Sequence, residues 1–347
     1  GHSLSQNVFE SANTFGDAGK EHFYNSKFYD LTKITTPKTI TKYVKTNLLS
    51  YFGRLNYKLL DKYLITASVR ADGSSTLAPG NKWGYFPSAA VAWRVNEESF
   101  LDQADWLDNL KIRASWGISG NAAIPAYGTM TALSVWPVYY YLNGANIPGS
   151  LPSQLGNARL KWEKTTSTNL GLDFGIVNNR ISGSVDVYFN YTDDLLYAKS
   201  APASSVYTSV LSNIGETKGH GVEVALNTLV AQSKKFSWDI NWTYSISTDE
   251  IVSLSGGITR NISGNVGQIV GQPIKIYYDY EDAGIWNVGE FEAYKTEWQA
   301  RHPDKTLAFP SGYGTPGTLK IADKDDNGLL NDEDKVVYNT APKHIFG

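Results

Sequence analysis

The sequence contains no cysteine, no long apolar run and no excess of positive charge, and each absence excludes a class of protein. Without cysteine the chain can have neither disulfide bonds, nor thiol chemistry, nor a cysteine-ligated zinc site. No stretch of about 18 apolar residues is present, so a helical membrane span is excluded whereas a membrane-spanning β-barrel is not. The formal net charge of −3 offers no basic surface, and we therefore expect no nucleic-acid partner.

Catalytic motifs and histidine-based metal motifs are also missing. The 5 histidines are scattered without the spacing of metal ligands. The neighbouring acids Asp193 and Asp194, like Glu281 and Asp282, lack a second carboxyl group at a predictable separation, which a glycosidase needs. We therefore expect no enzymatic activity and no catalytic residue. No signal peptide precedes Gly1, as in a mature chain or an internal fragment.

The sequence is rich in aromatic residues and in strict alternation of apolar and polar side chains. Its 347 residues include 22 Tyr and 10 Trp. In the stretch 161–194, apolar residues recur at alternate positions along two arms that meet at residues 177–180. Alternation with period two predicts strands with one apolar and one polar face, and Asn178 and Asn179 suit the positive φ of a tight turn. We expect one long β-hairpin here.

The same pattern recurs along the chain and predicts a series of long antiparallel strands. In residues 236–247, every second residue is apolar and all the intervening ones are polar. Other alternating stretches lie at 49–58, 63–72, 88–96, 110–119 and 222–227. Residues 1–46 have mixed polarity, and for them we expect a loop with at most one weak strand, at 21–31.

Two regularities favour a membrane barrel over a soluble sandwich. The strands run to about 9–12 residues, which suits a tilted bilayer crossing, whereas soluble strands average about 5–6. Short connections alternate with long ones, as do the periplasmic turns and extracellular loops of outer-membrane barrels. The short set is 58–62, 96–109, 177–180 and 228–235, and the long set is 73–85, 120–160, 193–217 and everything after 248.

The predicted fold is therefore all-β, an antiparallel transmembrane β-barrel of outer-membrane type whose apolar face meets the lipid bilayer. We assign residues 1–347 to one barrel segment, within which 249–343 form a long extracellular loop region. The alternative is a soluble extracellular β-sandwich that contains calcium, binds carbohydrate and packs its apolar faces on each other.

Several short motifs, in order along the chain, resemble the late barrel of SusC/RagA-type TonB-dependent outer-membrane transporters. They include Trp162-Glu163-Lys164-Thr165-Thr166, the segment 169–175, Asn178-Asn179-Arg180-Ile181, Asn213-Ile214-Gly215, Gly219-His220-Gly221-Val222-Glu223, Gly271-Gln272-Pro273-Ile274 and Ala341-Pro342-Lys343-His344. The resemblance covers about residues 47–347.

This resemblance implies a 22-strand barrel with an N-terminal plug, which imports glycan oligosaccharides or peptides beneath a SusD-like lipoprotein lid. About 8–10 of those strands are expected in this chain. Neither a TonB box, nor a plug, nor an N-terminal regulatory-like domain, nor a final strand is visible, so we expect a partial chain. TonB–ExbB–ExbD would act through the absent N-terminal part.

One acidic segment, 323–334, matches a calcium-binding loop. Its expected ligands are the side-chain oxygens at loop positions 1, 3, 5, 9 and 12 and a backbone carbonyl at position 7, with Gly328 at the sharp turn. These ligands are Asp323, Asp325, Asn327, Leu329 (carbonyl), Asn331 and Asp334. Asp334 replaces the glutamate of an EF-hand, as in dockerin-like loops. A structural Ca²⁺ that stiffens a long loop is one interpretation, and a solvated acidic turn is the other.

Aromatic residues of the long loops are the candidate substrate contacts. Their rings could stack on sugar faces as apolar platforms. The alternative is that they pack against a lid protein or against other loops. The candidates are Trp136, Tyr139, Tyr141, Tyr278 and Trp286.

Overall fold

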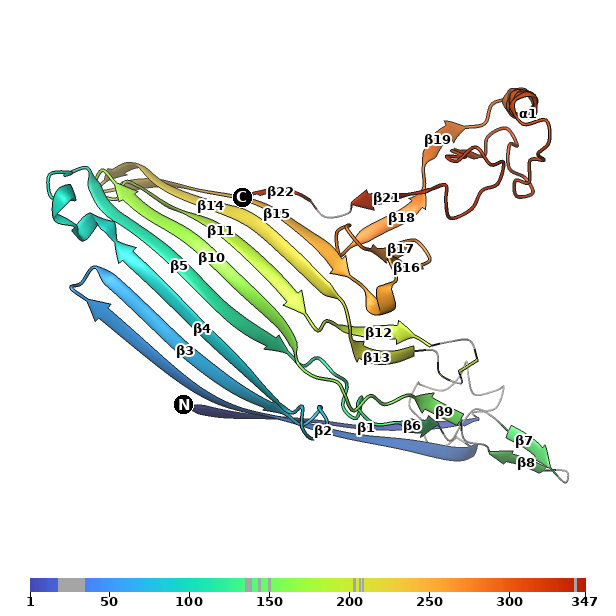
Figure 1. Cartoon of the computed structure of the whole chain (residues 1–347), viewed down its shortest axis with the longest axis horizontal. Helices are drawn as coiled ribbons and strands as arrows, with labels where there is room; N and C mark the ends of the chain where they lie inside the picture. Colours follow the sequence, from blue (N-terminus) through green and yellow to red (C-terminus); the bar gives the residue numbers. More distant parts are fainter. Residues whose placement is uncertain are drawn as a thin grey trace.

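The computed structural model of the chain is dominated by one large antiparallel β-sheet, with smaller elements gathered at one end (Figure 1). It describes residues 1–17, 35–134, 139–142, 145–148, 151–201, 204–205, 207, 209–339 and 342–347. Among these residues, no helix is long and apolar enough to cross a membrane.

The large sheet has 10 strands whose order in space follows their order in the sequence. Each strand pairs antiparallel with the next one, as in a meander. The strands are β1 (His2–Asp17), β2 (Thr35–Leu59), β3 (Tyr63–Ser74), β4 (Trp83–Arg94), β5 (Leu107–Asn121), β10 (Glu163–Ile176), β11 (Ile181–Asp193), β14 (Glu216–Ser233), β15 (Phe236–Ser253) and β22 (His344–Phe346). The predicted all-β antiparallel fold is confirmed.

The expected hairpin is formed by β10 and β11, in a register that pairs Ile176 with Ile181. Val177, Asn178 and Asn179 all have φ between 54° and 57°. The asparagines were expected to take this conformation because their short polar side chains tolerate it. The turn is held in place by Asp108, whose carboxylate accepts a hydrogen bond from the Asn179 N–H at 2.8 Å.

The expectation of a loop over residues 1–46 is wrong. β1 and the first half of β2 form a regular ladder from His2–Tyr51 to Phe15–Lys38, and the weak strand expected at 21–31 lies outside the described residues. Alternation is weak here because backbone hydrogen bonds can pair two strands without an apolar face, which only the part of a strand inside a bilayer requires.

The strands also run further toward the loop end than the alternation predicted. β4 begins at Trp83, so the expected loop at 73–85 shrinks, and β15 continues to Ser253. At the opposite, short-turn end, β14 extends to Ser233, into the turn expected at 228–235, with a bulge between Leu229 and Ala231 that interrupts the apolar–polar alternation.

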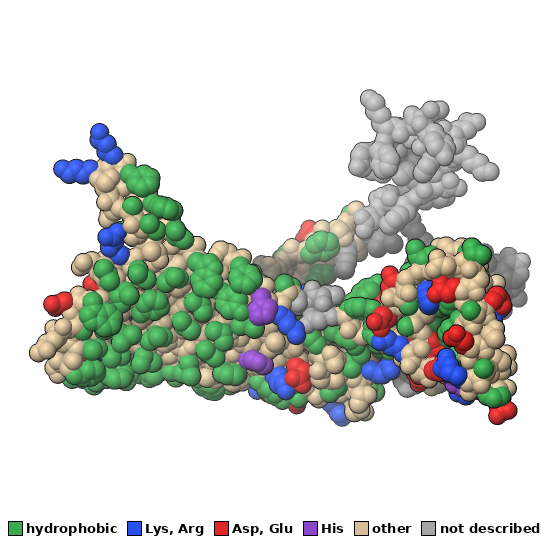
Figure 2. Space-filling view, turned by 90° about the horizontal axis from the view of Figure 1, so that it is seen from above, with side chains coloured by type: hydrophobic (Ala, Val, Ile, Leu, Met, Phe, Trp, Pro, Cys, Tyr) green, Lys and Arg blue, Asp and Glu red, His purple; other side chains and the backbone are tan. Residues whose placement is uncertain are grey.

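The apolar face of the sheet is uncovered in the described part of the chain. Trp238, Ile240 and Trp242 are 52%, 45% and 41% exposed. Figure 2 shows a face on which hydrophobic side chains cover the sheet, whereas acidic side chains gather toward the loop end. A soluble sandwich would bury these residues against a second sheet, so the sandwich alternative is wrong.

The loop end carries small sheets and one helix. Two strand pairs lie between β5 and β10 in the chain: β6 (Ala132–Ser134) with β9 (Leu151–Gln154), and, between these two in sequence, the hairpin of β7 (Tyr139–Leu142) and β8 (Ala145–Pro148). A third pairs β12 (Leu196–Ser200) with β13 (Ser209–Asn213). Within 249–343 lie a four-stranded sheet of β16 (Arg260–Ser263), β17 (Val266–Ile269), β18 (Ile276–Tyr280) and β21 (Lys335–Asn339), the pair β19 (Asp282–Ile285) and β20 (Leu319–Ile321), and α1 (Glu290–Arg301).

Candidate functional site

The acidic loop 323–334 brings three carboxylates together. One oxygen from each of Asp323, Asp325 and Asp334 lies within 4.8 Å of the others. Asp334 is fully buried, whereas Asp325 is exposed. Three of the six predicted ligands therefore lie around one point, and the calcium site stays a prediction.

Backbone N–H groups hold the two inner carboxylates of this loop. The Gly328 N–H donates to Asp323 Oδ2 at 2.9 Å, and the N–H groups of Lys324 and Asn331 donate to Asp334 at 2.8 and 2.9 Å. Gly328 has φ +81°, which a residue with a Cβ rarely adopts. The glycine at position 6 therefore makes the sharp turn, as the sequence predicted.

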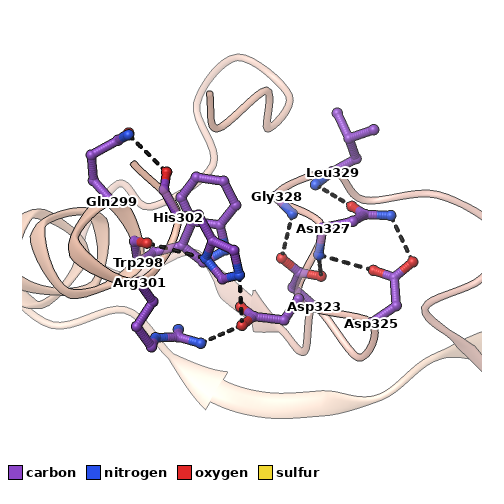
Figure 3. Close-up of polar contacts among 10 residues, drawn as sticks. Trp298, Gln299, Arg301, His302, Asp323, Asp325, Asn327, Gly328 and Leu329 are labelled. Carbon is purple, nitrogen blue, oxygen red and sulfur yellow. Dashed lines mark hydrogen bonds and ion pairs between the residues drawn. The ribbon is translucent and has the colours of Figure 1, made fainter. Parts of the chain in front are cut away.

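The remaining predicted ligands take part in the turn itself. The side-chain oxygen of Asn327 accepts from the Leu329 N–H at 2.7 Å (Figure 3). The side-chain oxygen of Asn331 accepts from the Glu333 N–H at 2.7 Å. Such side-chain to backbone bonds are typical of Asx turns. They fix the loop backbone while each oxygen keeps a second lone pair.

Burial raises the pKa of Asp323 above its ordinary value, and the neighbouring charge of Asp334 adds to this shift. The N–H groups of Gly328 and Asn327 oppose it. The ionised form of Asp323 is thus disfavoured by its surroundings, and a bound cation would relieve this penalty.

Helix α1 packs over the acidic loop. Trp298 is completely buried, and a Cβ added at Gly328 would lie 2.6 Å from its ring. His302 stacks on Trp298 with ring centroids 4.5 Å apart, and Arg301 forms an ion pair with Asp326 (Figure 3). The loop and the helix therefore form one packed unit, which the sequence did not indicate because its contacts join segments about 25 residues apart.

Two of the five candidate substrate contacts are buried within this region. Trp286 is 2% exposed and lies among the rings of Phe291, Tyr294 and Tyr313, with Lys320 Nζ 4.6 Å from its ring centroid. It offers no open face to a ligand, so its burial agrees with the packing alternative rather than with a sugar platform.

Tyr278 is likewise 5% exposed. Its hydroxyl accepts a hydrogen bond from Arg260 at 3.1 Å and donates one to the Asp332 carbonyl. Tyr139 and Tyr141 lie in β7, which places their backbone in a hairpin of the loop end. Trp136 lies outside the described residues.

The polar face of the sheet carries a charge network across three strands. Arg113 on β5 donates to both oxygens of Asp173 on β10, at 2.8–3.1 Å, and to Asp186 on β11 at 3.0 Å. Lys111 Nζ lies 2.7 Å from Asp173. The alternation of the sequence placed Lys111 and Arg113 on this face. Their carboxylate partners could not be predicted, because they depend on the register between strands.

A hollow of about 730 Å³ opens on the same polar face, toward the loop end of β2–β5. Its base is a cluster of buried apolar side chains under the loops: Leu77, Phe86, Ile124, Leu160 and Trp162. Sequence reasoning missed this cluster. Phe86 is the available signal, since an aromatic residue stands where β4 should place a polar one.

At the opposite end of the sheet, three side chains converge on Glu98, in the connection between β4 and β5. Its carboxylate accepts from the Tyr63 hydroxyl at 2.8 Å, the Trp93 indole N–H at 3.0 Å and Lys62 Nζ at 3.0 Å. These bonds, that from Tyr63 first, lower the pKa of Glu98 to about 2. Aromatic rings with a polar tip are typical of a membrane–water boundary.

Comparisons with known proteins agree with this architecture. The family model described as TonB dependent receptor-like, beta-barrel matches residues 2–324. TonB-dependent receptor SusC of Bacteroides thetaiotaomicron is 34% identical over 303 residues, which are 86% of this chain and 29% of that protein. TonB-dependent receptor P3 of Formosa agariphila is 32% identical over 313 residues, 87% of this chain and 30% of that protein.

Among solved structures, that of the RagAB peptide transporter aligns with a TM-score of 0.72 at 23% identity, over 100% of this chain and 37% of the matched chain. This likeness supports the fold. The chain spans about three tenths of the length of the curated relatives it matches. Those relatives are named as receptors and not as enzymes, in agreement with the expectation for this chain.

Proposed function

This chain belongs to the TonB dependent receptor-like β-barrel family, and we propose that it forms part of the wall of an importer for glycan oligosaccharides or peptides. As a member of that family it is a segment of a bacterial outer-membrane β-barrel. The importer is the full-length receptor, of which this segment supplies ten antiparallel strands and their loops.

One observation carries the proposal most directly: the sheet has two exposed faces of opposite character. The apolar face suits hydrocarbon, and the polar face, with its Arg113–Asp173–Asp186 network, suits a hydrated passage. A solute that crosses the membrane inside such a barrel meets only the polar face.

The peptide class is supported by a solved structure of similar fold, which is titled the RagAB peptide transporter. The glycan class rests on the resemblance of the sequence motifs to SusC/RagA-type transporters. Tyr139, Tyr141 and Trp136 remain our candidates for ligand contact at the loop end, whereas we assign Tyr278 and Trp286 to packing of the loops, given their burial.

The partners follow from the same proposal. The elements of 193–217 and 249–343 project beyond the strands and would meet a SusD-like lipoprotein lid. Energy would come from TonB–ExbB–ExbD, acting through the N-terminal part of the full-length receptor.

The function is tested by uptake in the native bacterium. Deletion of the gene for the full-length receptor should abolish accumulation of labelled oligosaccharides or of labelled peptides, and a plasmid copy should restore it. A strain that lacks TonB should show the same loss. Unchanged uptake of every labelled glycan and peptide after deletion would contradict the proposal.

We also propose that the loop 323–334 binds one structural Ca²⁺. The ligand spacing, the three convergent carboxylates and the raised pKa of Asp323 support a cation at their centre. Because Trp298 packs on Gly328, an ordered loop would keep α1 and its aromatic cluster in place. The ion would act on the shape of an extracellular surface and take no part in transport chemistry.

A further inference from the structure

We propose that the polar hollow at the loop end of β2–β5 is a binding site for a neutral oligosaccharide. This inference rests on the proposed importer function and narrows it, because the hollow lies on the face that would line the passage. Three features of the hollow support it, namely the chemistry of the lining, the balance of its charges and the packed base.

The lining contains many groups that both donate and accept hydrogen bonds, beside an apolar part. Six hydroxyl side chains and three carboxamides border the hollow, among them Ser68, Ser88, Ser74, Thr76, Asn47 and Asn121. The volume of about 730 Å³ falls within the range of about 300–1,000 Å³ that small-molecule sites occupy. Sugar hydroxyls require just such mixed partners, since each of them both donates and accepts.

The hydroxyls are arranged in pairs that keep capacity for a ligand. Ser68 and Ser88, partners on adjacent strands, lie 2.6 Å apart, and Ser74 and Thr76 lie 2.8 Å apart. Within a pair one hydrogen is used, so each pair retains one hydrogen to donate and several lone pairs to accept. A ligand hydroxyl can therefore bind without breaking the pair.

The charge of the lining is balanced. Its charged side chains are Arg70 and Asp72. The Arg70 Nε donates to both oxygens of Asp72 at 2.7 and 2.8 Å, and a second nitrogen of Arg70 donates to the Ser50 hydroxyl at 3.1 Å. An anionic glycan or a peptide with charged ends would find no uncompensated partner in this lining, which favours a neutral ligand.

The base of the hollow is apolar and firmly packed. Phe86 and Trp162 meet edge to face at 5.4 Å and are 7% and 6% exposed. The Trp162 indole N–H donates to the Lys82 carbonyl at 3.0 Å, which ties β10 to the β3–β4 loop. A preformed base reduces the entropy cost of binding, and the apolar part of the lining suits the C–H faces of a sugar ring.

The test compares hydroxyl removal inside and outside the hollow in the full-length receptor. The purified receptor is screened against arrays of neutral oligosaccharides, of uronate and sulfated oligosaccharides, and of peptides from a casein digest, and the best ligand is titrated by calorimetry. Ser68→Ala with Ser88→Ala should weaken binding of a neutral oligosaccharide about tenfold, since two hydrogen bonds are lost.

The matched control is Thr66→Ala with Ser115→Ala, which removes two hydroxyls from the same face outside the hollow and should leave affinity unchanged.

A second variant, Asp72→Asn, leaves Arg70 without its carboxylate and should raise the relative affinity for uronate oligosaccharides. Its thermal midpoint reports whether it folds.

Three results would overturn the inference: binding confined to peptides or anionic glycans, no binding to any array, or full affinity in the Ser68→Ala, Ser88→Ala variant. If the third result comes with a loss of thermal stability in that variant, the hollow is filled by another segment of the receptor. The importer proposal would survive each of these results as long as deletion of the gene still abolishes uptake.

Discussion

At the scale of single residues, two groups of charged side chains in the connections between strands fix the segments around them. Glu98 joins Tyr63, Trp93 and Lys62 at the short-turn end, while Asp323 and Asp334 order a loop at the other end. Both groups lie in connections between strands of the large sheet.

Replacement of Glu98 by Gln should lower the thermal midpoint of the receptor near neutral pH, because three donors lose a charged acceptor. The folded-state pKa of Glu98 is depressed from 4.5 to about 2. Its contribution is therefore complete above pH 4.5, declines as pH falls and is lost below about 2.

The measurement is thermal unfolding of both proteins in detergent across this pH range. The difference between wild type and Glu98→Gln should shrink as pH falls from 4.5 toward 2. Glu97→Gln, at an exposed neighbouring position, serves as the control and should show little difference at any pH. A gap between wild type and Glu98→Gln that does not depend on pH would contradict the role of the carboxylate.

Replacement of Asp323 and Asp325 by Ala should abolish stabilisation of the loop by calcium. A ligand at one hundred times its dissociation constant stabilises the bound form by about 2.7 kcal/mol. Wild type should therefore resist proteolysis between residues 282 and 334 in Ca²⁺ and lose this resistance with a chelator.

The double variant should be cleaved at the same rate with Ca²⁺ or with chelator. Asp304→Ala, an exposed acid in the same region outside the carboxylate cluster, should behave as wild type. Calcium-dependent protection that persists in the double variant would refute the metal site.

At the scale of elements, strand β15 has the dimensions of a bilayer crossing. From Phe236 to Ile246 its apolar side is continuous over ten residue steps. At about 3.4 Å per step and a tilt of about 40°, this run spans about 26 Å of membrane normal, close to the apolar band of about 25 Å in outer-membrane barrels.

Ile240 lies near the middle of this run, so Ile240→Arg should lower the free energy of unfolding in lipid by about 2–4 kcal/mol. The matched change is Asn241→Arg on the polar face of the same strand, where we expect an effect within about 0.5 kcal/mol. Folding titrations in lipid vesicles measure both. Equal effects at the two positions would mean that β15 does not separate lipid from water.

The strands that meet lipid were predictable, and the elements beyond them were not. Inside the bilayer every second residue must be apolar, so β15 and the β10–β11 hairpin can be identified from the sequence. β1 and the start of β2 are free of that requirement, so their sequences lack the apolar–polar alternation by which a strand is recognised.

The same reasoning explains the mixed outcome for the candidate sites. The spacing of the acidic loop is local, so its Asp323, Asp325 and Gly328 could be found from sequence. The burial of Trp286 and Tyr278 depends on contacts with distant segments, such as that between Trp286 and Tyr313. Loops of this length place aromatic residues by tertiary packing, which no local pattern encodes.

At the scale of the whole molecule, the medium that covers the apolar side of the ten-stranded sheet distinguishes a membrane barrel from a soluble protein. No described segment of the chain packs over this apolar side at Trp238, Ile240 and Trp242, which stay exposed. Such an area of contiguous apolar surface is unsuited to water and marks a membrane contact.

The most direct measurement is the accessibility of nitroxide labels in the full-length receptor, reconstituted in a bilayer. Labels are attached through Ile240→Cys and Asn241→Cys, and this chain contributes no competing cysteine. The account predicts that the label at 240 is reached by oxygen and shielded from a water-soluble nickel complex, with the order reversed at 241. A label at 240 that is shielded from both reagents, as within a protein core, would contradict it.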